Sequence, residues 1–168
     1  RVVVGSVESL IPPLGEALPA TWVERGSVGS LIPPLGEALP AIWVVRGGKV
    51  RIENIEFRGA RVASLNGAGI RFEKGSLTIR ACAFFDNEMG ILTWNSADLS
   101  LEVIDSEFGD APRHQANLHH LLYVGSIGKF VLRGSRFHNG YLGHLVKSRA
   151  RENFILYNML VDGAGGKA

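Results

Sequence analysis

The feature that most constrains the fold is a repeat in which five eight-residue segments follow one pattern. In each segment the first, third, sixth and eighth positions are mostly apolar, and successive segments begin 27, 24, 29 and 24 residues apart. A period of about 20–30 residues built on short apolar strands is typical of a solenoid, in which each repeat buries its face against its neighbours. The segments are Val50–Phe57, Leu77–Phe84, Leu101–Phe108, Phe130–Phe137 and Phe154–Val161.

The spacing inside each segment predicts a strand, a bend and a second strand. The first and third positions share one face of a strand, but the sixth has the opposite parity, so an unbroken strand would turn it outward. A bend at the fifth position resolves the conflict, and that position is Asn54, Ala81, Asp105, Gly134 or Asn158. Asn, Asp and Gly tolerate the left-handed backbone conformation best. A stack of such bends indicates a parallel β-helix, and the alternative is a set of ordinary hairpin turns, which favour the same residues.

A third strand is expected after the phenylalanine that ends each of the first four segments. The connections to it alternate in length: residues 58–68 and 109–119 are long, and residues 85–89 and 138–142 are short. Long loops on one side of a solenoid commonly carry binding residues. The aligned third strands are Gly69–Phe72, Gly90–Thr93, His120–Tyr123 and Gly143–Val146.

One stretch of the repeat is similar to a known family. The pattern Leu77-x-Ile79-x-x-Cys82-x-Phe84-x-Asp86-Asn87-x-x-Gly90-Ile91 resembles a coil of the pectate-lyase-like superfamily, and the resemblance covers roughly residues 42–161. It implies an all-β fold, a right-handed three-sheet parallel β-helix, here with about seven coils. The superfamily contains lyases, hydrolases, epimerases and proteins with no known activity, so the resemblance fixes no reaction.

The first 47 residues contain a second and much sharper repeat. Gly5–Gly26 and Gly26–Gly47 are offset by 21 residues and differ at three aligned positions, which indicates a recent duplication or deliberate construction. Each copy predicts a short coil, with strands at Trp22–Glu24 and Trp43–Val45 and a Pro-Pro-Leu-Gly turn. We expect these coils to stack on the main coils of residues 48–161, with a flexible tail over 162–168, in one continuous domain. The start at Arg1 suggests a trimmed, processed or engineered chain.

Composition removes several classes of function. The chain has 18 basic and 16 acidic residues, a net charge of +2, and these charges are intermixed, so we expect no nucleic-acid partner. No apolar run reaches the length of a membrane span, so we expect no membrane partner. The single cysteine, Cys82, excludes a disulfide framework and is predicted to be buried. The compartment cannot be predicted.

Polar side chains that could carry chemistry concentrate between residues 110 and 149, where all five histidines lie. If the protein is an enzyme, His120, His144 and Lys147 are the acid/base candidates, and Arg113 and Arg149 would bind a carboxylate. Further substrate-binding candidates are His119, Tyr141 and Trp94. The histidine spacing matches no standard zinc pattern, so no metal or cofactor is predicted.

The alternative to a catalytic cluster is a set of solvated loop groups with one histidine hydrogen-bonded at the solenoid wall. The orientation of His144 stays open at this point. The alignment places it inward, beside Ile91 and Leu121, whereas a slip of one residue would place it outside.

Two classes of function therefore compete. One is a β-helix that binds or processes an acidic polysaccharide, by β-elimination or hydrolysis if it is catalytic. The other is a non-enzymatic structural, self-assembling or engineered scaffold. Because the fifth segment ends at Val161 without a cap, the chain is also expected to self-associate through exposed coil ends.

Overall fold

The computed structural model describes residues 2–4, 41–113 and 119–163. These residues form fourteen strands and no helix, so the predicted all-β class is confirmed. Accordingly, no membrane-spanning helix is found in this part of the chain.

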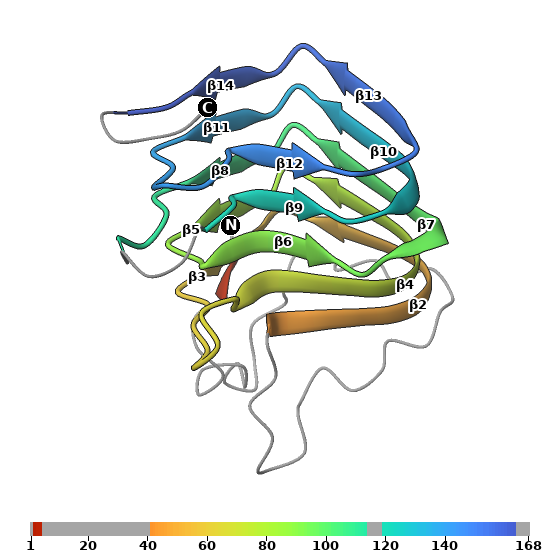
Figure 1. Ribbon diagram of the computed structural model, residues 1–168, viewed down its shortest axis with the longest axis horizontal. Helices are drawn as coiled ribbons and strands as arrows, with labels where there is room; N and C mark the ends of the chain where they lie inside the picture. Colours follow the sequence, from red (N-terminus) through yellow and green to blue (C-terminus); the bar gives the residue numbers. More distant parts are fainter. Residues whose placement is uncertain (1, 5–40, 114–118, 164–168) are drawn as a thin grey trace.

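One side of the molecule is a six-stranded parallel sheet of short strands, one from each successive coil (Figure 1). Its order is β1-β3-β5-β8-β11-β14, so from β3 onward neighbours in the sheet are separated in the sequence by one coil. The strands are β1 (Val2–Val4), β3 (Ile55–Arg58), β5 (Ala83–Phe85), β8 (Glu107–Gly109), β11 (Arg136–His138) and β14 (Met159–Val161).

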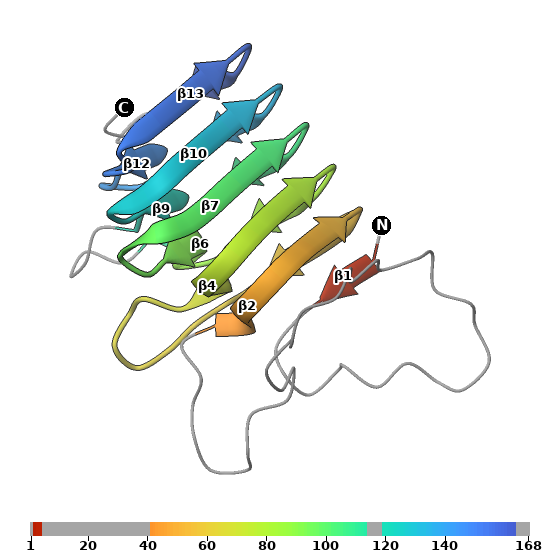
Figure 2. The same cartoon turned by 90° about the vertical axis from the view of Figure 1, so that its right-hand side faces the viewer.

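The other strands form an eight-stranded sheet. Its long strands bend, so that this one sheet makes two faces of the solenoid. The first part of β4 pairs with β6, and its last part pairs with β7, so β4 folds around a corner of the coil. Figure 2 shows the second of these faces, with β2, β4, β7, β10 and β13 side by side. The strands are β2 (Ala41–Glu53), β4 (Ala68–Arg80), β6 (Met89–Thr93), β7 (Ser96–Ile104), β9 (Leu122–Val124), β10 (Ile127–Arg133), β12 (Val146–Ser148) and β13 (Glu152–Leu156).

The three faces make a parallel β-solenoid of about five turns, against the expected seven coils. The two additional coils are those expected in the duplicated segment. Residues 5–40 of that segment lie outside the described residues, and so do the strand expected at Trp22–Glu24 and both proline turns. The strand expected at Trp43–Val45 is part of β2.

The stack of bends is confirmed in four coils and is displaced in the fifth. Asn54, Ala81, Asp105 and Gly134 have φ angles of 59°, 50°, 48° and 62°. In the fifth coil the left-handed residue is Tyr157, with φ 56°, so the prediction for Asn158 is wrong. The strand pairing shows the same shift of one residue. Val131 pairs with Phe154, whereas the sequence alignment places Phe154 opposite Phe130.

Asn158 explains this slip of one residue. Its side chain occupies the inward position that Ser135 fills one coil earlier: Oδ1 accepts the Ser135 N–H at 2.9 Å, and Nδ2 donates to the Leu132 carbonyl at 3.0 Å. Aligning two phenylalanines by type therefore gave the wrong register, because hydrogen bonding by a polar side chain sets the position of this coil.

The register of the third strands also differs from the alignment. Ile91 pairs with Leu122, and Leu122 pairs with Val146, one residue away from the expected partners in both cases. Leu121 and Leu122 are consecutive and both buried, which fits a chain that turns a corner between them. Alternation of apolar residues cannot choose a register at such a corner.

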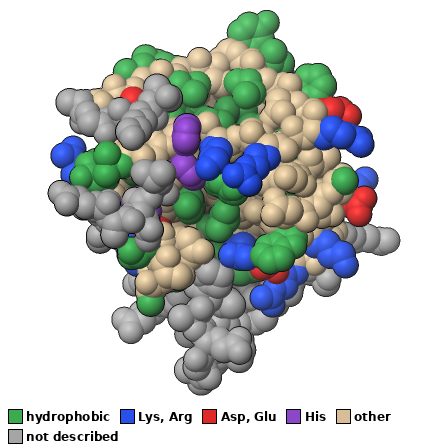
Figure 3. Space-filling view, viewed as in Figure 1, with side chains coloured by type: hydrophobic (Ala, Val, Ile, Leu, Met, Phe, Trp, Pro, Cys, Tyr) green, Lys and Arg blue, Asp and Glu red, His purple; other side chains and the backbone are tan. Residues whose placement is uncertain are grey.

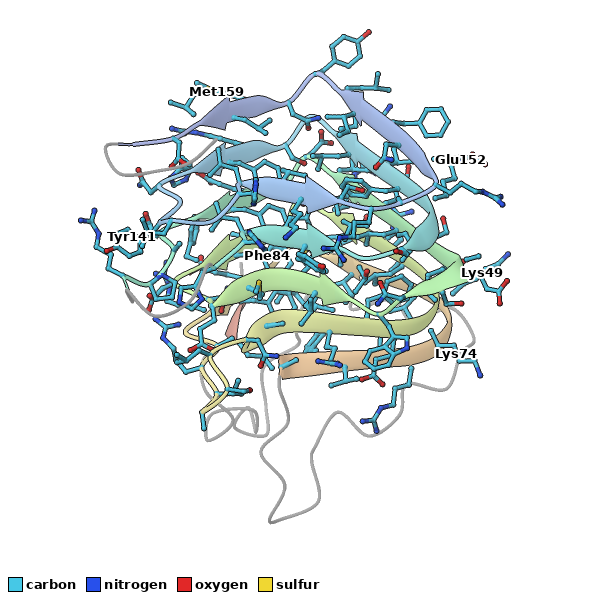
Figure 4. The ribbon with its side chains drawn as sticks, viewed as in Figure 1. Lys49, Lys74, Phe84, Tyr141, Glu152 and Met159 are labelled. Carbon is cyan, nitrogen blue, oxygen red and sulfur yellow. The ribbon has the colours of Figure 1, made fainter. Side chains whose placement is uncertain are left out.

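The core is organised around a column of stacked aromatic rings. Phe57, Phe84, Phe108 and Phe137 are all buried, and the ring centroids of successive members are 5.0, 4.5 and 4.7 Å apart, with interplanar angles of at most 8°. Phe84 is labelled inside the coil in Figure 4. Trp43 closes one end of the column edge-on, 5.1 Å from Phe57. Cys82 is buried, as predicted.

Candidate functional site

The candidate site lies on the outer surface of the face formed by the first parts of β2 and β4 with β6, β9 and β12. Two columns of outward side chains cross this face from coil to coil. The first is Ala41, Ala68, Met89, His120 and His144, and the second is Val44, Arg71, Leu92, Tyr123 and Lys147. The columns are largely apolar in the early coils and become polar and cationic on β9 and β12. Figure 3 shows histidine and Lys/Arg side chains gathered in the middle of this face.

His120 is the buried centre of the cluster and is held by its neighbour in the next coil. The His144 backbone N–H donates to His120 Nδ1 at 2.9 Å. His120 is 5% exposed, whereas the His144 side chain is exposed. The rings are 5.0 Å apart, so the register slip that the sequence left open puts His144 outside and beside His120.

The hydrogen bond to Nδ1 fixes which nitrogen of His120 carries the proton. A neutral imidazole has one acceptor and one donor, so an accepting Nδ1 leaves the hydrogen on Nε2. Nε2 lies 3.4 Å from Lys147 Nζ, and an ammonium can only donate. Two donors therefore face each other, and neither offers the acceptor that the other needs.

The surroundings keep His120 neutral. Burial, together with the positive charges of Lys147, His144 and His119, lowers the pKa of His120 to about 4. At neutral pH the ring is therefore a hydrogen-bonding group and not a cation, and the positive charge of the cluster rests on its lysine and arginine.

Tyr123 organises the cationic side chains. Its ring stacks on His120 with centroids 5.4 Å apart and an interplanar angle of 15°. Lys147 Nζ lies 5.1 Å from the Tyr123 ring centroid, and the Arg149 guanidinium carbon lies 5.8 Å from it. Among the described residues, neither Lys147 nor Arg149 forms an ion pair with a carboxylate. The cluster thus presents hydrogen-bond donors and positive charge with no protein anion to meet them.

Trp94 lies on the same face, two strands away from Arg149. It is 54% exposed, and the Arg71 guanidinium lies 5.3 Å from its ring. Strands in a sheet are about 4.8 Å apart, so two strands separate Trp94 from Arg149 by about 10 Å. A pocket of about 410 Å³ adjoins Trp94 and is lined also by Arg46, Glu73 and Lys74. This second group has its own carboxylate, because Glu73 pairs with both Arg46 and Arg71.

Two of the expected substrate-binding residues form a separate group on the loops after β8 and β11. The Arg113 guanidinium lies 5.9 Å from the Tyr141 ring, beside a cleft whose lining includes Asp110 and Asn139. Tyr141 is at the edge of the molecule in Figure 4. His119 is 0% exposed and its backbone bridges to Tyr141, so its side chain has no surface to offer a substrate.

Asn87 and Glu88, in the short connection after β5, have a structural role. Asn87 accepts the Ala60 N–H and donates to the Phe57 carbonyl, both at 2.9 Å. Glu88 Oε2 accepts the N–H groups of Val62 and Gly67, at 3.1 and 2.6 Å. The two side chains therefore fasten the long loop after β3. No group of three or more His, Cys, Asp or Glu side chains that could hold a metal ion is found in the described ranges.

The sequence reasoning identified His120, His144, Lys147 and Arg149 but missed Tyr123 and Arg71. Both were detectable in principle, because they share an outward column with Lys147 once the register is right.

Comparisons with models of protein families, with curated proteins and with solved structures found no match. The resemblance to the pectate-lyase-like superfamily therefore rests on the repeat pattern and on the solenoid fold alone.

Proposed function

We propose that this β-solenoid binds an acidic polysaccharide across the outer face of β6, β9 and β12. The observation that carries the proposal is the convergence of His120 Nε2–H, Lys147 and Arg149 around Tyr123 without a carboxylate partner among the described residues. A carboxylate oxygen of a uronate would accept from these donors and would satisfy the two that now face each other.

The arrangement on a flat sheet face suits an extended polymer. Tyr123 and Trp94 provide aromatic surface for sugar rings, and Arg71 lies beside Trp94 just as Lys147 and Arg149 lie beside Tyr123. A chain that crosses the strands would meet both groups in succession, about 10 Å apart. Binding through exposed charges is screened by salt, so the affinity should fall as ionic strength rises.

A titration that compares two polymers tests the proposal. Polygalacturonate should bind, and the methyl-esterified polymer, which has the same backbone without the charge, should bind at least tenfold more weakly. The double variant Lys147→Gln/Arg149→Gln should lose at least tenfold in affinity for the charged polymer.

The matched control is Arg80→Gln, which removes an exposed positive charge where β4 ends on another face. It should change the affinity less than twofold, because net charge alone does not create the site. Equal losses in both variants, or equal binding of both polymers, would contradict the proposal.

Processing of the polymer is a second candidate, favoured by the contact of neutral His120 with exposed His144. In β-elimination a base removes the proton α to the uronate carboxylate, the glycosidic oxygen leaves with the bonding pair, and a C=C bond forms in the product. His144 would be the base and the cations would neutralise the carboxylate. Appearance of the unsaturated product in wild type and its loss in His144→Ala, with binding retained, would establish this activity. Binding without product would leave the binding function alone.

A further inference from the structure

Trp94 and the charged residues around it form a second group on the outer face, apart from the histidine cluster. Glu73 binds two arginines there: its Oε1 accepts from Arg71 Nε at 2.9 Å, and its Oε2 accepts from Arg46 Nε at 3.1 Å. The adjoining space of about 410 Å³ is lined, among the described residues, by Arg46, Glu73, Lys74 and Trp94. We call this space the Trp94 pocket.

A β-bulge brings two consecutive residues of β4 to the pocket. The pairing of β2 with β4 shifts at Arg46, which lies opposite Lys74, so that Glu73 is an extra residue on β4. In a regular strand Glu73 and Lys74 would point to opposite faces, but a bulge interrupts that alternation. Both side chains therefore line the same pocket. Figure 4 labels Lys74 at this corner of the coil.

Glycines fix the backbone next to the bulge. Gly75 on β4 has a φ angle of 95°, and Gly48 on β2 has a φ angle of 75°. A Cβ atom on Gly75 would collide with the Gly48 carbonyl, so the two strands approach more closely here than a side chain allows. The backbone that carries Glu73 and Lys74 is therefore held close to β2.

The pocket has two positive charges that no carboxylate balances. Glu73 pairs with Arg71, whose side chain is 17% exposed, and with Arg46, whose side chain is 50% exposed. One carboxylate balances one of these charges, and we assign it to the more buried Arg71. Within the described ranges, Lys74 forms no ion pair. The surplus charge at the pocket is therefore that of Arg46 and Lys74.

The free hydrogen-bond donors suit an oxoanion with several oxygens. Arg46 binds Glu73 through Nε, so its two terminal nitrogens are left to donate, and neither bonds to a residue that the structure describes. Lys74 is exposed and adds an ammonium group. Arginine binds phosphate through such paired donors, and lysine binds it as a point charge.

We propose that the Trp94 pocket binds a phosphomonoester carried on a sugar or nucleoside ring. A phosphomonoester has about two negative charges at pH 7 and three acceptor oxygens, which match the surplus charges and donors of Arg46 and Lys74. A carboxylate would balance only one of the two charges. Trp94 is 54% exposed and gives a surface for the ring beside them. The pocket is also of the size of small-molecule sites, about 300–1,000 Å³.

Calorimetric titration of the full chain tests the site with ligands that separate charge from ring. Glucose 6-phosphate and adenosine monophosphate carry the same phosphate on a sugar and on a nucleoside, and at least one should saturate at one molecule per chain. The better of the two identifies the ring. Its sulfate ester has a single negative charge and should bind at least tenfold more weakly. Inorganic phosphate has no ring and should bind at least fivefold more weakly.

Two variants test the charges and the ring surface separately. Arg46→Gln/Lys74→Gln should lower the affinity for the better ring phosphate at least tenfold. Trp94→Ala should lower it at least fivefold but leave the affinity for inorganic phosphate within twofold of wild type. The control Arg80→Gln/Arg133→Gln removes two exposed positive charges where β4 and β10 end on another face, and it should change the affinity less than twofold. The replaced side chains are exposed, so circular dichroism spectra should match wild type.

Four outcomes would overturn the proposal. Absence of saturable binding of either ring phosphate to folded wild type would exclude the site. Equal affinities for the phosphate and sulfate esters would remove the match to two charges. Equal losses in Arg46→Gln/Lys74→Gln and in its control would show attraction by net charge alone. Lys147→Gln/Arg149→Gln, about 10 Å away, should still bind the ring phosphate, and loss of binding there would place the phosphate in the histidine cluster instead.

Discussion

Replacing Phe108 with Ala should destabilise the protein strongly, because Phe108 lies inside the aromatic column with a stacked ring on each side. The Phe108 ring is 0% exposed and stacks on Phe84 at 4.5 Å and on Phe137 at 4.7 Å. A buried Phe→Ala change costs about 3–5 kcal/mol, and each stacked aromatic pair contributes about 0.5–1.5 kcal/mol beyond its buried area. With two such pairs lost, we expect the upper part of that range, about 4–5 kcal/mol.

Phe137 gives a graded comparison within the same column. It stacks on Phe108 on one side only, and on the other side its neighbour in register is Leu160, which is 46% exposed. Phe137→Ala loses one stacked pair and leaves a site that water can reach, so we expect a smaller cost, about 3 kcal/mol. Comparing the loss in free energy of unfolding between Phe108→Ala and Phe137→Ala therefore tests whether ring stacking stabilises the protein.

The measurement is urea unfolding followed by circular dichroism and by tryptophan fluorescence. Coincidence of the two transitions shows all-or-none unfolding, and midpoint shifts at an unchanged m value then convert into free energies of unfolding. Phe85→Ala is the control, because this neighbouring ring is only half-buried, under the Arg58 guanidinium. It should cost about 1 kcal/mol. A Phe108→Ala cost no larger than that of Phe85→Ala would refute the packing argument.

Other properties of the chain are testable in the same way. The folded pKa of His120 is about 4, below its ordinary 6.5, so the unfolded chain binds more protons between these values. The stability from His120 is present above about pH 6.5 and is lost as pH falls towards 4; His120→Gln should flatten that part of the pH–stability profile, and an unchanged profile would contradict the assignment. Asn54→Val should cost about 1–3 kcal/mol in urea unfolding, because Asn54 has φ 59°, whereas Arg51→Val on the exposed strand surface should cost under about 0.5 kcal/mol. Ala81→Gly, at φ 50°, should stabilise by up to about 1 kcal/mol, and a loss of stability would show that the bend carries no strain.

The sequence predicted the parts of the fold that depend on residue type at a repeated position. Asn54, Asp105 and Gly134 are residues that favour a left-handed bend, and even Ala81 was identified because its position recurs. The second stack of bends, at Gly59, Asp86, Asp110 and Asn139, was not predicted. Each of these residues lies two positions after the phenylalanine that ends a segment, so the same repeat aligns them. They were not predicted because the expected pattern stopped at that phenylalanine.

The candidate site was predicted in its members but not in its geometry. Histidine and lysine are few enough that their concentration near residue 144 drew attention to His120, His144 and Lys147. Tyr123 did not stand out, because a tyrosine on a strand is common in any sheet. Its role depends on lying in the same outward column as Lys147, which is a property of the register.

The candidate site follows from register, which in a solenoid with corners is set by hydrogen bonds more than by apolar pattern. A slip of one residue exchanges the two faces of a strand. The Leu121 N–H donates to the His144 carbonyl, and the register it helps to fix brings His144 beside His120 on the outer face. In the fifth coil, the hydrogen bonds of Asn158 turn Phe154 and Met159 outward. Leu121 and Leu122 are consecutive and both buried, so the apolar pattern alone does not choose the register at this corner. The few polar groups that bind the backbone therefore decide which side chains the protein presents on its outer surface.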